Sequence, residues 1–104
     1  MEPTETDQQV IEKLRSLKDT LERVRGMISA GDLDGASEKA QEISRGYDCE
    51  MCEAIETDVY ALCLMVSAAP SHRRDDRVRL AKNEIDAYTT QIAGELKAAE
   101  KKQS

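Results

Sequence analysis

Hydrophobic residues recur along this chain at the three- and four-residue steps that are typical of α-helices. The first stripe ends before Gly31 and consists of Val10, Leu14, Leu17, Leu21, Val24 and Ile28. It predicts a helix over residues 7–30, because glycine is common just beyond a helix end. A shorter stripe consists of Leu33, Ala36, Ala40 and Ile43. It predicts a second helix over residues 33–45, capped at its start by Asp32 or Asp34.

Two further stripes follow in the second half of the chain. One predicts a helix over residues 49–69, ends at Pro70, and consists of Cys52, Ile55, Val59, Leu62 and Val66. The other predicts a helix over residues 72–100 and includes Val78, Ala81, Ile85, Tyr88 and Ile92. Short connections between four helices favour an all-α, antiparallel four-helix bundle with a short second helix. We expect a single domain over residues 7–100, a flexible tail over 1–6 and a frayed tail over 101–104.

The second half of the predicted helix 49–69 is apolar on every side, since Ser67 is the one plainly polar residue in the segment 59–69. In a small bundle each helix faces water on one side, so this segment predicts an exposed apolar patch. The unequal helix lengths add to this, because parts of the first and last helices would lack a neighbour in a monomer. We therefore predict a homodimer whose interface includes Tyr60, Leu64, Met65 and Ala68. The alternative is a monomer in which this helix sinks across the other three.

Charge is unevenly distributed along the chain, whose net charge is −6. Residues 31–69 carry two basic and nine acidic side chains, and residues 70–104 carry eight basic and six acidic ones. The acidic middle argues against nucleic-acid binding, which needs clustered Lys and Arg. The basic cluster at residues 72–79 is a solvated, salt-bridged face or a contact for an acidic partner or a phosphate. In a dimer it could also meet the acidic residues 48–58 of a second copy.

The chain opens on polar residues and contains no run of about 20 apolar residues that would span a bilayer. These features predict a cytoplasmic protein without a membrane partner. A possible protein partner other than a second copy stays open.

Cys49 and Cys52 form a C-x-x-C pair at a predicted helix start. They could provide half of a site for zinc or another thiophilic metal shared between two chains, or act as a redox pair. The third cysteine, Cys63, lies about 16 Å beyond Cys52 along one helix, so the two cannot bind one ion. The simplest interpretation is that Cys52 and Cys63 pack as small apolar side chains. We expect His72, the sole histidine, to be solvated.

The sequence contains no arrangement of residues that suggests catalysis, such as a phosphate-binding loop or a Ser/His/Asp set. We therefore predict a non-enzymatic helical interaction or adaptor module without a cofactor. The alternative is a metal- or thiol-responsive regulator that uses Cys49 and Cys52.

Overall fold

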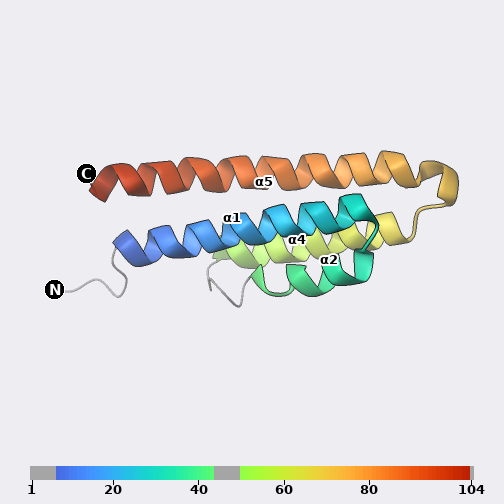
Figure 1. The fold of residues 1–104 in the computed structure, drawn as a ribbon, viewed down its shortest axis with the longest axis horizontal. Coiled ribbons are helices and arrows are strands. Elements are labelled where there is room, and N and C mark those ends of the chain that lie inside the picture. Colours follow the sequence, from blue (N-terminus) through green and yellow to red (C-terminus); the bar gives the residue numbers. More distant parts are fainter. Residues whose placement is uncertain (1–6, 44–49, 104) are drawn as a thin grey trace.

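The computed structural model describes residues 7–43 and 50–103 and is helical almost throughout. It contains the α-helices α1 (Asp7–Ala30), α2 (Leu33–Ala40), α4 (Glu50–Ser67) and α5 (Arg74–Gln103), and the 3-10 helix η1 (Ser71–Arg73). These helices pack into an elongated bundle, and no strand occurs in the two described segments (Figure 1). The predicted fold class, an all-α helical bundle, is confirmed. The predicted tail at residues 1–6 and the last residue of the predicted tail 101–104 lie outside the described residues. Residues 101–103 belong to α5, so the predicted tail begins too early.

The turn between α1 and α2 forms where the sequence places glycine and aspartate. Gly31 has φ +86°, a left-handed conformation that an L side chain rarely adopts. The Asp32 side chain then accepts a hydrogen bond from the Gly35 backbone N–H at 3.0 Å, which caps α2. Of the two predicted caps, Asp32 is the one that the structure uses.

Helix α2 ends at Ala40, five residues before the predicted end at 45. The Glu42 backbone N–H bonds to the Lys39 carbonyl at 3.0 Å, so the chain tightens into a turn there. Ile43, at the end of the predicted stripe, is still buried. Residues 44 and 45 of the predicted helix lie outside the described part of the chain.

The connection between α4 and α5 forms around Pro70. The Ala68 N–H still bonds to the Leu64 carbonyl at 2.9 Å, and Pro70 then has the extended conformation that ends a helix. One turn of 3-10 helix leads into α5, which begins at Arg74 and continues to Gln103, past the predicted end at residue 100.

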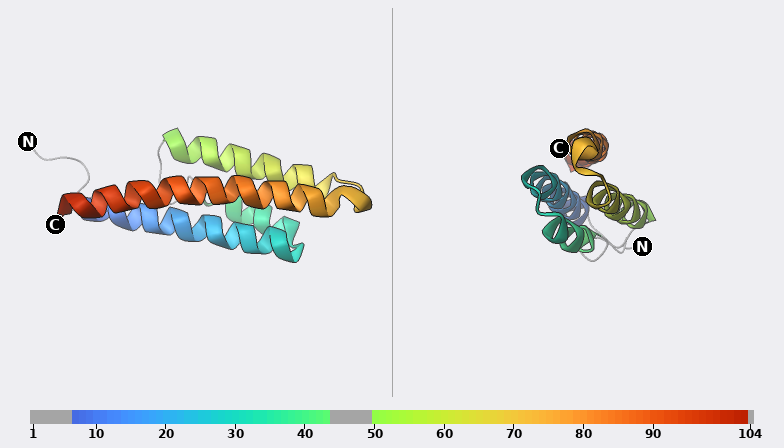
Figure 2. Two further views of the ribbon diagram at one scale, coloured as in Figure 1. Left: turned by 90° about the horizontal axis from the view of Figure 1, so that it is seen from above. Right: turned by 90° about the vertical axis from the view of Figure 1, so that its right-hand side faces the viewer.

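Each helix packs against two neighbours, in the order α1, α5, α4, α2 around the bundle (Figure 2). Polar pairs define the direction of the helices. Arg15 and Glu100 form an ion pair at 2.7 Å, and Arg25 and Asp86 form another at 2.6 Å. Residue numbers rise on α1 as they fall on α5, so these two helices run antiparallel.

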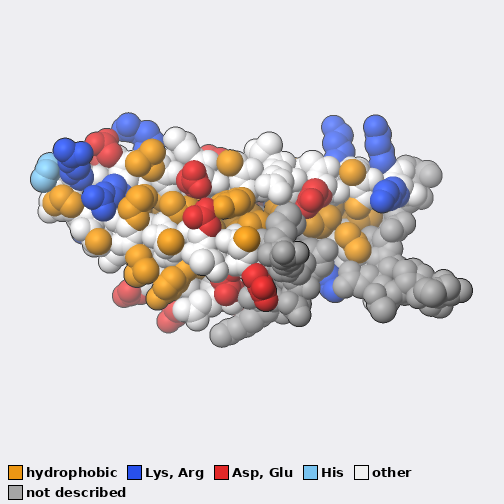
Figure 3. All heavy atoms as spheres, turned by 180° about the vertical axis from the view of Figure 1, so that it is seen from behind, with side chains coloured by type: hydrophobic (Ala, Val, Ile, Leu, Met, Phe, Trp, Pro, Cys, Tyr) orange, Lys and Arg blue, Asp and Glu red, His pale blue; other side chains and the backbone are white. Residues whose placement is uncertain are grey.

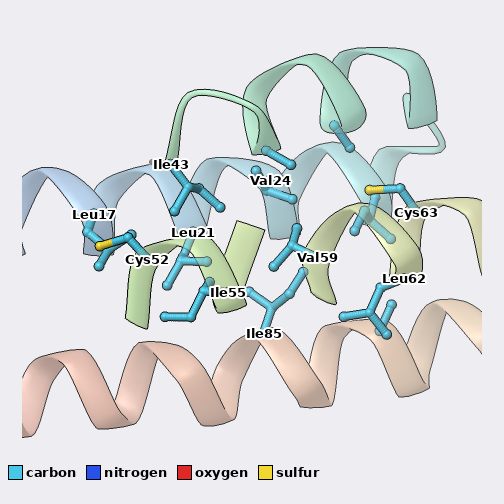
Figure 4. Close-up of a cluster of buried hydrophobic side chains, with 14 of the residues drawn as sticks. Leu17, Leu21, Val24, Ile43, Cys52, Ile55, Val59, Leu62, Cys63 and Ile85 are labelled. Atoms are coloured by element: carbon cyan, nitrogen blue, oxygen red, sulfur yellow. The ribbon is translucent and has the colours of Figure 1, made fainter. Parts of the chain in front are cut away.

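The core consists of the predicted stripes facing one another. Figure 4 shows Ile55 and Val59 of α4 directed toward Leu21 of α1 and Ile85 of α5. All four side chains are at most 2% exposed. Burial of each such side chain contributes about 1.5–3 kcal/mol, so these aliphatic contacts provide most of the driving force for packing.

The expectation that parts of the long helices would be uncovered is wrong for α1. Ile11 and Leu14, which lie near its start, are 2% and 4% exposed. On α5, Ile92 is also buried, and Leu96 and Ala99, which lie nearer the end of the helix, are half-buried. The unequal helix lengths therefore give no reason for a partner at this end. Among the described helices none is long and apolar enough to cross a membrane.

Candidate interaction surface

Helix α4 carries two stripes with the same spacing, one buried and one exposed. The inner stripe follows steps of 3, 4, 3 and 4 residues and consists of Cys52, Ile55, Val59, Leu62 and Val66, all at most 9% exposed. The outer stripe follows the same steps, is exposed at every position, and consists of Ala54, Thr57, Ala61, Leu64 and Ala68. Because the stripes are offset by two residues, or about 200° around a helix, they lie on nearly opposite faces. We refer to the second set as the outer stripe of α4.

The structure places the predicted interface residues on or beside the outer stripe. Leu64 is 53% exposed and Tyr60 is 40% exposed, while Ala68 is also open to solvent. Met65 differs from these three, because it is half-buried and packs against the core. The four residues therefore share the outward half of α4, but Met65 belongs partly to the interior.

One exposed apolar residue on the neighbouring helix α5 was not among the predicted interface residues. Leu80 of α5 is 57% exposed, the largest value for a large apolar side chain among the described residues. Arg77, one turn earlier, donates a hydrogen bond to the Met65 carbonyl at 3.1 Å, so this side of α5 faces α4. Leu80 is thus an exposed apolar side chain on the helix that packs beside α4. The sequence could have identified Leu80, because it is a large apolar residue that lies outside the predicted stripe of its helix.

On its other flank, the outer stripe borders two hollows between α2 and α4. Tyr60 lines both of them, one of about 410 Å³ and one of about 240 Å³. The lining of the larger hollow also includes Ser37, Cys63 and Leu64. Tyr60 and Gln41 line both hollows, so the surface beside the outer stripe is uneven rather than flat.

Exposed charged side chains lie at both ends of α4. Glu53 is exposed near the start of the helix, and Arg73 is exposed just beyond its end. Neither side chain has an ion-pair partner within the described segments. Figure 3 shows this face, with hydrophobic side chains along the bundle and Lys and Arg side chains gathered beside the histidine at one end. The exposed apolar residues of α4 therefore lie between an acidic side chain near its start and a basic side chain just beyond its end.

The predicted metal or redox pair is only partly described. Cys49 lies outside the described residues, and Cys52 is buried and disulfide-bonded rather than a free thiol. Cys63 is a free, buried thiol whose pKa is raised by burial, against the opposing effect of a hydrogen bond with Ser37. Figure 4 shows Cys52 and Cys63 at separate places in the core, which agrees with the separation expected along one helix.

Metal-ligating side chains do not gather elsewhere in the described segments. Those segments contain no group of three or more His, Cys, Asp or Glu residues that could hold a metal ion. His72 is exposed in η1, as expected for a solvated histidine.

The chain was compared with protein-family models, curated proteins and solved structures, and none of the three comparisons gives a match.

Proposed function

We propose that this protein is a non-enzymatic helical interaction module that forms a homodimer through the outer stripe of α4. The observation that carries the proposal is the exposure of Leu64 and Tyr60 on one face of a helix whose opposite face is already buried. Contiguous apolar surface of this kind marks an interaction site more often than a free surface.

The spacing of the outer stripe supports a helix as the partner. Steps of 3 and 4 residues are the pattern by which one helix presents side chains to another in coiled-coil packing. Three of the five positions are alanine, which allows two helix backbones to approach closely. Leu64 supplies the largest side chain of the stripe. Covering its exposed half would contribute about 1 kcal/mol in each copy.

The test is the mass in solution of Leu64→Glu, measured by size-exclusion chromatography with light scattering. A carboxylate at this position would have to be desolvated in the interface, so the variant is expected to be a monomer. Circular dichroism checks that its helix content equals that of the unmodified protein, as expected for a change at an exposed position.

Thr90→Glu is the matched control for this experiment. Thr90 is exposed on α5, one turn after Asp86, and Asp86 pairs with α1 rather than with α4. The control should dimerise like the unmodified protein. If Leu64→Glu has the same mass as Thr90→Glu, the proposed interface is wrong.

A second candidate function is a thiol-responsive regulator that uses Cys49 and Cys52. Because Cys52 is disulfide-bonded, we favour a regulator that responds through thiol chemistry over one that binds zinc or another thiophilic metal. Reduction with dithiothreitol should then change the dimer dissociation constant, with Cys52→Ser as the control that removes the response. A constant that is the same before and after reduction would exclude this regulator. A cytoplasmic location stays a prediction.

A further inference from the structure

Two copies of the outer face of α4 are complementary when they are placed antiparallel. The acidic end is marked by Glu53 and the basic end by Arg73, with the apolar residues between them. In an antiparallel pair the acidic end of each copy meets the basic end of the other. In a parallel pair, like charges would meet at both ends.

The exposed residues between Glu53 and Arg73 are centred on nearly the same point of the sequence as these two charged residues. Tyr60 and Leu64 lie on either side of residue 62, and Thr57 and Ala68 lie on either side of a point between residues 62 and 63. Glu53 and Arg73 are centred on residue 63 in the sequence, with Arg73 beyond the end of α4, in η1. A twofold axis near this point pairs Tyr60 with Leu64, and it brings Glu53 of each copy toward the end that carries Arg73 of the other.

The flanks of the stripe fit the same arrangement. Tyr60 lies on the side that faces α2, where it lines both hollows. Leu80 lies on the side that faces α5, since Arg77 one turn earlier contacts the Met65 carbonyl. Both side chains are thus placed to border a second helix that lies along the stripe.

We infer that the occupant of the outer stripe is a second copy of this chain, bound antiparallel about a twofold axis near residue 62, with Glu53 of each copy facing Arg73 of the other. This inference rests on the proposed function, because it specifies the geometry of the dimer. It also assigns a role to Arg73, which lies in η1 and forms no ion pair among the described residues. A closed twofold dimer buries both copies of the stripe and leaves neither free to extend into a filament.

The test is a charge exchange measured by sedimentation equilibrium at low ionic strength. Glu53→Arg places like charges opposite Arg73 at both ends of the dimer, and Arg73→Glu does the same with Glu53. Each single variant should raise the dimer dissociation constant about tenfold, since two exposed pairs are converted from attractive to repulsive. The double variant Glu53→Arg with Arg73→Glu restores opposite charges and should return the constant to near that of the unmodified protein.

Salt provides the control within the same experiment. Raising the ionic strength to about 1 M shortens the screening length to about 3 Å, so the effect of each single variant should largely disappear. Thr90→Arg, a charge change on the far side of α5, should leave the dissociation constant unchanged.

The outcomes separate this inference from the function on which it rests. The unmodified protein could dimerise while the double variant has a dissociation constant as high as those of the single variants. In that case the proposed dimer is supported and the antiparallel register is wrong. If the unmodified protein is a monomer at every concentration tested, both proposals fail. Restoration by the double variant supports both.

Discussion

The hydroxyl of Tyr88 donates a hydrogen bond to the carboxylate of Asp58 and so joins α5 to α4. Both residues are half-buried at the edge of the core. The bond to Asp58 raises the pKa of Tyr88 to about 12, and burial and the nearby carboxylate of Glu84 act in the same direction. Because the neutral phenol is the donor, the bond exists only while Tyr88 is protonated.

This bond predicts a loss of stability at high pH. An unfolded tyrosine ionises near pH 10, whereas folded Tyr88 keeps its proton to about pH 12. The folded state therefore binds more protons than the unfolded state in this interval. The contribution of Tyr88 is fully present below pH 10 and disappears as the pH rises to about 12. Urea unfolding at a series of pH values measures it.

Tyr88→Phe is the variant that isolates this effect from other groups that titrate at high pH. It should lower the free energy of unfolding by about 1 kcal/mol at pH 7, the usual value of a partly exposed hydrogen bond. The difference between the two proteins should then shrink above pH 10. A difference that stays constant to pH 12 would show that Tyr88 does not hold this bond.

Two apolar side chains on α5 should differ sharply in their contribution to stability. Ile85 is fully buried, whereas Leu80 is 57% exposed. Ile85→Ala removes core contacts and should cost about 2–5 kcal/mol, and Leu80→Ala should cost less than about 1 kcal/mol. Chemical denaturation measures both. If Ile85→Ala unfolds the protein, Ile85→Val should still show a loss of about 0.5–1.5 kcal/mol.

Replacing glycine by alanine should destabilise the protein at one position and stabilise it at another. Gly31→Ala introduces a side chain at φ +86° and should destabilise the protein by about 1–2 kcal/mol. Gly94 lies inside α5, where a Cβ would meet no atom within 4 Å. Gly94→Ala should therefore stabilise the protein by about 0.5–1 kcal/mol. Equal effects of the two substitutions in thermal unfolding would contradict the described turn.

The thiol of Cys63 should be protected in the folded protein. It is 1% exposed, and burial raises its pKa, so little reactive thiolate is available at pH 8. Mass spectrometry after iodoacetamide treatment should show no modification of Cys63 without urea and complete modification in urea. Rapid native-state labelling would mean that the contact between α2 and α4 opens easily.

Much of the fold could be predicted from the sequence because each helix carries its own stripe. The spacing of Leu17, Leu21 and Val24 defines a face without knowledge of its neighbour. The end of α2 could not be predicted in this way, since the stripe continues to Ile43 through the turn at Glu42. The spacing of hydrophobic residues does not show at which residue one backbone hydrogen bond turns the chain and ends the helix.

The candidate site was predicted only in part. The all-apolar segment identified Tyr60 and Leu64, because a helix that is apolar on every side must expose some of those side chains in a small bundle. Leu80 and the bond between Tyr88 and Asp58 were missed. The bond between Tyr88 and Asp58 depends on the register between α4 and α5, which no pattern within a single helix contains. Leu80 could have been identified, because it lies outside the apolar stripe of its own helix.

The mass of the unmodified protein in solution tests the central claim most directly. Sedimentation equilibrium over a wide range of concentrations should show a reversible monomer–dimer equilibrium that approaches twice the chain mass of 11.6 kDa. A single species of 11.6 kDa at every concentration would contradict the claim that the outer stripe of α4 binds a second copy.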